Sequence, residues 1–361
     1  MRTKRILAAA LFAGVVGGSL GSGTEDTIMA QPPAPRASSL PVERQLASFA
    51  GATSWLNSPP LTAAGLRGKV VLVDFWTFTC VNWLRTLPYV RAWATKYKDQ
   101  GLVVVGVHTP EFSVEHDVAN IRRAVEAMRI EYPVAVDSDY GVWRAFDNAY
   151  WPAVYLADAQ GRIRYHHFGE GEYEQTERAI QQLLMEAGAS GVGSDLVSPE
   201  PRGTEVAADW SNVKSGESYV GYEKAELFAS PGGIVRDRPH AYAEPSKWAL
   251  NRWALTGEWA VGREIAAAEK PKARIAYRFH ARDVNLVMGS GAPGRAARFR
   301  VRIDGKAPEM SHGTDVDAQG NGTVTEPRLY QLIRQPKPIE DRLFEIEFLD
   351  PGVETFCFTF G

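Results

Sequence analysis

The sequence predicts an α/β layer fold over residues 42–187, followed by an antiparallel β-sandwich over residues 204–361. In the first region, apolar strand-like runs alternate with amphipathic helix-like runs, and such alternation is typical of α/β folds. In the second region, short alternating or apolar runs are separated by turn signals, which is typical of a sandwich. Residues 188–203 lie between the two regions and are rich in Gly, Ser and Pro, so we expect a linker there.

Hydrophobic periodicity places the elements of the α/β region. Lys69–Trp76 is almost wholly apolar and rich in β-branched residues, which predicts a strand covered on both faces. Apolar residues recur at helical spacing over Trp83–Tyr97, with Pro88 inside this predicted helix. The remaining expected elements are a strand at Leu102–Val107, a helix at Val118–Met128, a short strand at Tyr132–Val136, a brief helix at Asp139–Phe146, a hairpin of Ala153–Ala157 with Ile163–Phe168, and a helix at Glu174–Glu186.

The β region is predicted from short runs that lack helical periodicity. Before these runs, a tryptophan-rich stretch holds Trp248, Trp253 and Trp259. Such residues can form an aromatic platform for a sugar or a peptide, but clustered tryptophans more often belong to a core, which is our preferred interpretation. The expected strands are Ala273–Ala281, Val284–Met288, Ala297–Ile303, Leu329–Ile333, Leu343–Leu349 and Thr355–Phe360.

Composition excludes several classes of protein. The chain has 361 residues, which suits two domains of ~100–200 residues each. Its 40 Lys+Arg against 43 Asp+Glu leave no basic excess to neutralise a phosphate backbone, so we expect no nucleic-acid partner. Two cysteines are too few for a disulfide scaffold or a cysteine-built zinc site. The histidines are scattered and no hydrolase or phosphate-binding motif occurs, so we expect no metal and no cofactor.

The first residues have the form of an export signal. Met1–Arg5 carries three basic residues, and Ile6–Leu20 is apolar but shorter than the ~20 residues that span a bilayer. A retained anchoring helix is the alternative. We expect a signal peptide and leader at residues 1–30, a flexible segment at residues 31–41, and a protein that is exported to the periplasm or another extracytoplasmic space, where thiols meet oxidising conditions.

Cys80 is the residue around which chemistry is expected. It directly follows a predicted buried strand and precedes a predicted helix. A cysteine at a helix N-terminus lies near free backbone N–H groups and the positive end of the helix dipole, and both favour the thiolate. The thiolate is the species that attacks a disulfide sulfur or a peroxide oxygen. Arg85, in the second helical turn, either adds positive potential or is simply a solvated residue on the helix face.

Residues 42–187, with the stretch KVVLVDFWTFTCVNWLRTLPYV around Cys80, resemble a thioredoxin-fold domain of the TlpA/redoxin type. The resemblance extends to the periplasmic part of DipZ-type cytochrome c biogenesis proteins, in which a carbohydrate-binding-like sandwich follows. Asp74 matches the acid six residues before the nucleophilic cysteine, Pro88 matches the kink of the active-site helix, and Pro152 matches a cis-proline beside the sulfur. The resemblance therefore implies a three-layer α/β/α thioredoxin fold followed by an all-β, jelly-roll-like sandwich.

One position departs from that family. Members that cycle a disulfide carry C-x-x-C, whereas Trp83 stands here in place of the second cysteine. Because tryptophan cannot attack a mixed disulfide, an outside thiol must release it. Glutathione, a partner cysteine or a membrane electron donor are the candidates. Cys357 is a further candidate for the second thiol, but it lies in a strand-like run of the other predicted domain. Alternation places Phe356 and the other phenylalanines of that run on the opposite face, so we expect Cys357 to be a packed small hydrophobe.

The resemblance also implies roles for neighbouring residues. Asp74 either assists proton transfer or remains as a buried group whose pKa is raised. Trp83, Trp151 and Pro152 are expected to line a binding groove, in which a cis-proline leaves a backbone edge free for an extended substrate; a tight turn is the alternative. Thr77, three residues before the cysteine, resembles the peroxide-orienting threonine of peroxiredoxins, although that family's proline is absent.

Three functional hypotheses follow. The first is an exported thiol oxidoreductase in which Cys80 acts on protein or small-molecule disulfides. The second is a thiol peroxidase in which Thr77 assists Cys80. The third is a non-catalytic protein that uses the groove beside Pro152 to bind extended segments of a partner.

Overall fold

The computed structural model of the chain describes residues 39–291 and 294–361. The predicted signal peptide and leader, and residues 31–38 of the flexible segment, lie outside the described residues. Residues 40–361 pack together as one compact unit, so the division into two domains expected at residues 188–203 remains a prediction. We refer to residues 42–187 as the α/β region and to residues 204–361 as the β region. In the described part of the chain, no helix is both long enough and apolar enough to cross a membrane.

The strand that leads to Cys80 is the central strand of a mixed sheet in the α/β region. β3 (Val70–Trp76) pairs in parallel with β4 (Leu102–His108) and antiparallel with β6 (Ala153–Ala157), so both of its edges are hydrogen-bonded within the sheet. Such a strand is buried on both faces, as its apolar sequence predicted. In the described residues the order across the sheet is β1 (Arg44–Gln45), β7 (Arg162–Phe168), β6 (Ala153–Ala157), β3 (Val70–Trp76), β4 (Leu102–His108), β5 (Val134–Val136) and β2 (Ser54–Leu56).

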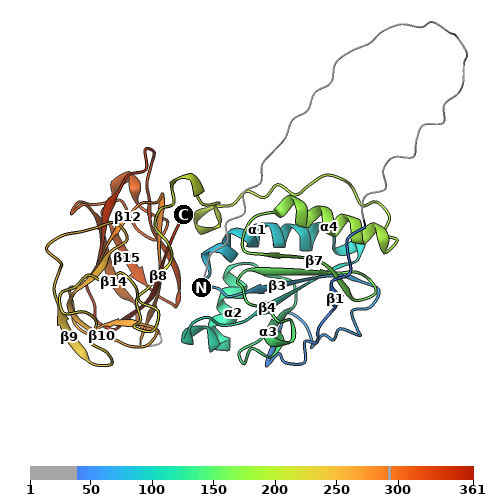
Figure 1. The fold of residues 1–361 in the computed structure, drawn as a ribbon, viewed down its shortest axis with the longest axis horizontal. Helices are drawn as coiled ribbons and strands as arrows, with labels where there is room; N and C mark the ends of the chain where they lie inside the picture. Colours follow the sequence, from blue (N-terminus) through green and yellow to red (C-terminus); the bar gives the residue numbers. More distant parts are fainter. Residues whose placement is uncertain (1–38, 292–293) are drawn as a thin grey trace, which may run out of the picture. The chain divides into compact units, whose positions relative to one another are not determined.

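Helices cover both faces of this sheet (Figure 1). Successive side chains of a strand point to opposite faces, so Val70, Leu72 and Trp76 of β3 pack in one apolar cluster with α1 (Val81–Lys96), α2 (Val118–Ala127) and α4 (Tyr173–Glu186). Val71, Val73 and Phe75 pack in a second cluster with α3 (Gly141–Ala145). Asp74 follows the same alternation and therefore lies under α1. The three-layer α/β/α thioredoxin fold is confirmed. The helices are α1 (Val81–Lys96), α2 (Val118–Ala127), α3 (Gly141–Ala145) and α4 (Tyr173–Glu186), and the short 3-10 helices are η1 (Lys98–Gln100), η2 (Ser113–His116), η3 (Gly203–Glu205), η4 (Trp210–Asn212) and η5 (Glu309–Ser311).

The β region is a sandwich whose two halves share strand β10. The first residues of β10 (Trp253–Val261) pair with β12 (Ala273–Phe279), and its later residues pair with β9 (Pro239–Tyr242) and β11 (Ala266–Ala268). Gly257 lies between these two stretches with a φ of 87°, a left-handed value that favours glycine. Within the described residues the hydrogen-bonded order is β15 (Asn321–Val324), β14 (Ala297–Ile303), β17 (Arg342–Phe348), β12 (Ala273–Phe279), β10 (Trp253–Val261), β11 (Ala266–Ala268), β18 (Val353–Phe360), β13 (Asp283–Ser290) and β16 (Arg328–Arg334), with β8 (Ser218–Tyr219) on β18 and β9 (Pro239–Tyr242) on β10.

Two of the three tryptophans considered in the sequence, Trp253 and Trp259, belong to the core of the β region, whereas Trp248 is half-buried and lies outside it. Trp253 and Trp259 lie on β10, and both are fully buried in the apolar cluster between the sheets. The sequence did not predict β10 as a strand. Its apolar alternation is interrupted at Gly257, where the chain passes from one half of the sandwich to the other.

The last strand, β18, does not keep the alternation of side-chain faces that the sequence predicted. On β13, Val287 pairs with Cys357 and the next residue, Met288, pairs with Thr355, so Phe356 is an extra residue on β18. Such a β-bulge interrupts the alternation of faces. Phe356 consequently joins Cys357 in the apolar cluster that includes the α/β region, rather than the core of the sandwich where the other phenylalanines of the strand pack. The prediction that Phe356 faces away from Cys357 is wrong for this reason.

Candidate active site around Cys80

Cys80 lies where the sequence predicted, between a buried strand and a helix. Its backbone adopts an extended conformation immediately before α1, and its carbonyl oxygen accepts the Leu84 N–H at 3.0 Å. A short turn that begins at Thr77 separates it from β3; the Cys80 N–H donates to the Thr77 carbonyl oxygen at 3.2 Å. Cys80 is free and partly exposed. Its sulfur therefore lies at the end of the sheet, beside the first helical turn.

The sulfur lies beside the Trp-Pro turn, as the resemblance implied. The Trp151–Pro152 peptide bond is cis, and the thiol of Cys80 is 3.9 Å from the carbonyl oxygen of Trp151. The Trp151 indole N–H donates to the Thr109 carbonyl oxygen at 3.1 Å, which ties this turn to the loop after β4. Pro152 is buried and Trp151 is half-buried. Cys80, Trp151 and Pro152 thus form one site.

Trp83 does not line a groove, in contrast to the expectation. Its side chain is fully buried beneath α1, where it stacks on Trp76 with ring centroids 4.3 Å apart. Its indole N–H donates to Asp74 Oδ2 at 2.9 Å. Position 83 is one helical turn after Cys80, and the inward side of that turn faces β3. The tryptophan therefore fills core volume and supplies a hydrogen bond to one oxygen of a buried acid.

Asp74 has the electrostatics of a buried carboxyl. Burial raises its pKa from 3.8 to about 7, and the hydrogen bond from Trp83 opposes this rise. Its other oxygen, Oδ1, has no hydrogen-bond partner among the described residues. The raised pKa expected from burial is confirmed, so the protonated carboxyl is favoured far more than in an exposed aspartate.

The Thr77 hydroxyl faces a buried polar cluster. It lies 3.5 Å from His108 Nε2, and burial lowers the pKa of that histidine to about 3. Glu115 is fully buried in the same cluster. One carboxylate oxygen accepts the Thr79 hydroxyl at 2.6 Å, and the other accepts the backbone N–H of Glu111 at 2.6 Å. Glu115 therefore holds the turn before Cys80 against the loop after β4, and Thr77 belongs to this support.

Backbone N–H groups stabilise the Cys80 thiolate as expected, but the burial of the sulfur has a larger and opposite effect on its pKa. Backbone N–H groups of Trp83 and Asn82 lower the pKa of Cys80, as its position at a helix N-terminus predicted. Burial, the largest effect, raises that pKa, and the negative charges of Glu111 and Glu217 raise it further. The net result is a pKa above the ordinary value of a cysteine. The prediction of an ionised sulfur is wrong for this conformation because burial dominates.

Arg85 is neither solvated nor directed to the sulfur. Only 2 % of its side chain is exposed, and it pairs with Glu170 at 2.9 Å. A second guanidinium nitrogen donates to the carbonyl oxygen of Phe360 at 3.2 Å. Arg85 therefore joins α1 to the end of β18.

A group of polar residues that the sequence did not indicate lies beside Cys80. The Tyr219 hydroxyl donates to Glu111 Oε1 at 2.6 Å and lies 3.1 Å from Glu217 Oε2, while Lys224 Nζ lies 3.4 Å from Glu111 Oε1. Glu217 is exposed as a residue, yet partial desolvation and the charge of Glu111 raise its pKa. Glu111 belongs to the α/β region and the others to the β region. No local sequence signal joins them, because they are over one hundred positions apart.

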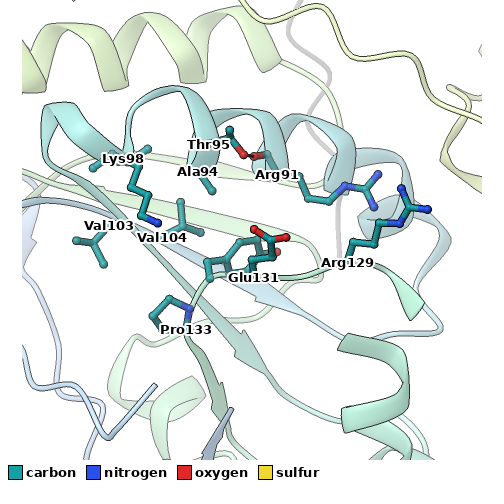
Figure 2. A pocket seen from close by; sticks show the side chains of 11 residues that line it. Arg91, Ala94, Thr95, Lys98, Val103, Val104, Arg129, Glu131 and Pro133 are labelled. Atoms are coloured by element: carbon teal, nitrogen blue, oxygen red, sulfur yellow. Dashed lines mark hydrogen bonds between the residues drawn. The ribbon is translucent and has the colours of Figure 1, made fainter. Parts of the chain in front are cut away.

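A separate cavity of about 490 Å³ lies away from the sulfur. Figure 2 shows Lys98 near one end of it, Arg91 and Arg129 near the other, and Glu131 between them. The cavity is lined by the last turns of α1 and the strands beneath them. None of its lining residues belongs to the Cys80 site.

Comparisons with known proteins agree with this architecture. Residues 44–166 match the model of the AhpC/TSA family, and residues 215–361 match a model described as a thioredoxin like C-terminal domain. Protein DipZ of Mycobacterium tuberculosis is 38% identical over 315 residues, which cover 86% of this chain and 42% of DipZ. The chain thus spans less than half the length of that relative.

A shorter relative is covered almost completely. The thiol-disulfide oxidoreductase YkuV of Bacillus subtilis is 30% identical over 145 residues, which cover 40% of this chain and 97% of YkuV. Among solved structures, the solution structure of a thioredoxin-like protein in the oxidized form is 32% identical, with a TM-score of 0.37, over 40% of this chain and 97% of that one.

Proposed function

The chain belongs to the family of thioredoxin-like thiol-disulfide oxidoreductases, and from that premise we propose that it is an exported oxidoreductase whose Cys80 attacks disulfides. The observation that supports this most strongly is the position of the sulfur, 3.9 Å from the Trp151 carbonyl oxygen at a partly exposed helix N-terminus. An extended substrate bound along the Trp151–Pro152 turn would present its disulfide to that sulfur.

The proposed reaction starts from the minor, ionised form of Cys80. The thiolate attacks one sulfur of a protein or small-molecule disulfide, forms a mixed disulfide with it, and releases the other sulfur as a thiolate that takes a proton from solvent. Burial holds the pKa of Cys80 high, so the thiolate is scarce near neutral pH, although a thiol of higher pKa is the stronger nucleophile once ionised. Displacement of the residues that bury the sulfur would lower its pKa.

Reducing equivalents must come from outside the active-site helix. Trp83 occupies the position of a second cysteine, and its indole N–H donates to Asp74 Oδ2 at 2.9 Å. We therefore infer an external reductant such as glutathione or a membrane electron donor. Asp74 lies behind Trp83, so we assign it an electrostatic and packing role instead of direct proton transfer to a resolving thiol in this helix.

Turnover with a disulfide substrate tests the proposal. Purified protein is mixed with insulin and glutathione, and glutathione oxidation is followed through a coupled reductase. We expect a rate above that of glutathione alone, and we expect Cys80→Ser to return the rate to that background while its thermal unfolding stays like that of the natural protein. An equal rate in Cys80→Ser would refute the proposal. Peroxide consumption that depends on Cys80, without insulin reduction, would favour a peroxidase.

A non-catalytic binding protein is the second candidate. The observation that favours it is the raised pKa of Cys80 together with Trp83 at the second cysteine position. In that case, neither insulin reduction nor peroxide consumption would exceed background, and a Cys80→Ser variant would bind the same extended peptides as the natural protein.

Export is part of the proposal and is tested separately. The basic and apolar start of the chain supports it. Expression of the full chain in a bacterium with a periplasm should yield a shortened protein in the periplasmic fraction, and removal of residues 1–30 should retain it in the cytoplasm. Equal partition of both forms would contradict export.

A further inference from the structure

We propose that Cys357 of β18 is the second thiol of the reaction: it attacks the mixed disulfide on Cys80 and closes a disulfide between the two regions of the chain. This inference rests on the proposed function and deepens it. It supplies the resolving thiol that the active-site helix lacks, and it assigns a role to the only other cysteine of the sequence.

The β-bulge of β18 turns Cys357 toward the α/β region. Because Phe356 is an extra residue, both it and Cys357 leave the sandwich core and pack in the apolar cluster that continues through the α/β region. The Phe356 ring lies 5.3 Å from the ring of Phe112, a residue of the loop after β4. Cys80 packs against this same cluster. The two cysteines therefore meet one continuous apolar surface from opposite regions.

The same two carboxylates lie within electrostatic reach of both sulfurs. The negative charges of Glu217 and Glu111 raise the pKa of Cys80, and the same pair raises the pKa of Cys357 after the larger effect of burial. The Cys357 thiol donates to the Phe358 carbonyl oxygen at 3.3 Å, and it lies near enough to Glu217 to lower the pKa of that carboxyl slightly. Cys357 is paired across the strands with Tyr219, whose hydroxyl reaches Glu111 of the α/β region at 2.6 Å. This chain of contacts runs from Cys357 to the loop beside Cys80.

The chemistry needs no reagent beyond those of the proposed function. The Cys357 thiol passes its proton to the nearby Glu217 carboxylate, and its sulfur attacks the Cys80 sulfur of the mixed disulfide. The Cys80–Cys357 bond forms, the bond to the substrate sulfur breaks, and the substrate leaves as a thiolate that is protonated by solvent. Two equivalents of an external thiol then return the pair to the reduced form. A carboxylate whose pKa is raised, as that of Glu217 is, accepts this proton more readily than an ordinary glutamate does.

Cys357 has a relative exposure of 1%, but its partner in this step is the Cys80 sulfur of the same chain, so Cys357 does not need to reach a substrate in solvent. What the step requires is that the two Cα atoms reach about 4.4–6.8 Å, the range of disulfides. The Tyr219–Glu111 hydrogen bond and the Phe356–Phe112 ring contact join the strand of Cys357 to the loop after β4, beside the turn that holds Cys80. A direct search for the bond therefore decides the proposal.

The reduced protein is mixed with one equivalent of glutathione disulfide, samples are quenched with acid, and intact mass and peptide maps are recorded over time. In the natural protein we expect a transient glutathionyl adduct on Cys80, followed by a peptide in which Cys80 and Cys357 are joined. In Cys357→Ala the adduct should persist about a hundredfold longer, because an internal thiol acts at an effective concentration on the order of mM against ~10 µM free glutathione. In Cys80→Ser we expect no adduct and an unmodified Cys357.

The outcomes separate this inference from the proposed function. An adduct that persists equally in the natural protein and in Cys357→Ala overturns the resolving role but leaves Cys80 as a nucleophile. No adduct in either protein contradicts the proposed function itself. As a second arm, the natural protein is oxidised with diamide, which removes two hydrogens from a dithiol without a substrate. A Cys80–Cys357 peptide supports the pairing, and its absence together with unmodified Cys357 overturns it.

Discussion

Replacement of Asp74, the buried acid beneath the active-site helix, should change how the free energy of unfolding depends on pH. Asp74 is fully buried, receives one hydrogen bond from Trp83 and has a pKa of about 7 in the folded protein against 3.8 as the ordinary value. The folded protein thus holds the Asp74 proton more tightly than the unfolded chain does. The stability linked to this proton is fully present below the unfolded pKa and is lost as the pH rises through the folded pKa.

The magnitude follows from the two pKa values. A folded pKa about three units above the unfolded value corresponds to about 4 kcal/mol of unfolding free energy, lost mainly between about pH 4 and pH 7. Asp74→Asn cannot ionise, so this pH dependence should disappear. We expect the stability of Asp74→Asn relative to the natural protein to rise by about 4 kcal/mol from about pH 4 to about pH 8.5. Any constant effect of the amide on packing leaves this change untouched.

Urea unfolding at a series of pH values measures the effect. Asp139→Asn, which removes an exposed carboxylate, is the matched control and should not reproduce the change seen for Asp74→Asn. Trp83→Phe keeps an aromatic ring but removes the N–H donor, and it should raise the pKa of Asp74 further. Curves for Asp74→Asn and the natural protein that stay parallel across this range would refute the burial argument.

Three further predictions address the site and its support. Glu217→Gln removes a negative charge that raises the pKa of Cys80, so alkylation by iodoacetamide at about pH 8 should be severalfold faster; an unchanged rate would contradict the assigned electrostatics. Below the pKa of Cys80, the rate of glutathionyl adduct formation should rise about tenfold per pH unit, because the thiolate fraction rises by that factor. Stopped-flow or mass measurements give this rate, and a flat profile near neutrality would indicate a sulfur that is already ionised. Arg85→Met leaves Glu170 buried without its partner, so urea unfolding should show a loss of about 3 kcal/mol; a loss below about 1 kcal/mol would mean that the pair is solvated in solution.

The parts predicted correctly from the sequence are those set by local pattern. The apolar run before Cys80 produced a buried strand, and the helical spacing after it produced α1. The position of Cys80 between them followed from these two patterns alone. The cis bond at Pro152 was implied by the resemblance and is present. The tryptophans of β10 were assigned to the core because large aromatic side chains bury most of their surface there.

The parts that were missed depend on contacts between distant residues. Arg85 was expected to be solvated or to act on the sulfur, but its partners Glu170 and Phe360 are 85 and 275 positions away. Glu217 has no sequence signal, because its effect on Cys80 exists only after the two regions meet. The facing of Phe356 was predicted from strict alternation, and a single inserted residue reverses such a prediction.

The direction in which the pKa of Cys80 shifts could not be predicted from the local sequence either. The backbone N–H groups at the start of α1 were predicted correctly and do lower the pKa of Cys80. Their effect is smaller than that of burial, and burial is a property of the assembled fold. The correct sign of the shift therefore required the structure.

The reactivity of Cys80 with a disulfide in the folded protein is the most direct test of the whole account. The folded, reduced chain is exposed briefly to glutathione disulfide, and peptide mapping then locates every oxidised sulfur. The account predicts that Cys80 is found either with a glutathionyl group or joined to Cys357. If both cysteines stay reduced in the folded chain and react only after denaturation, the sulfur beside the Trp-Pro turn is not a redox centre.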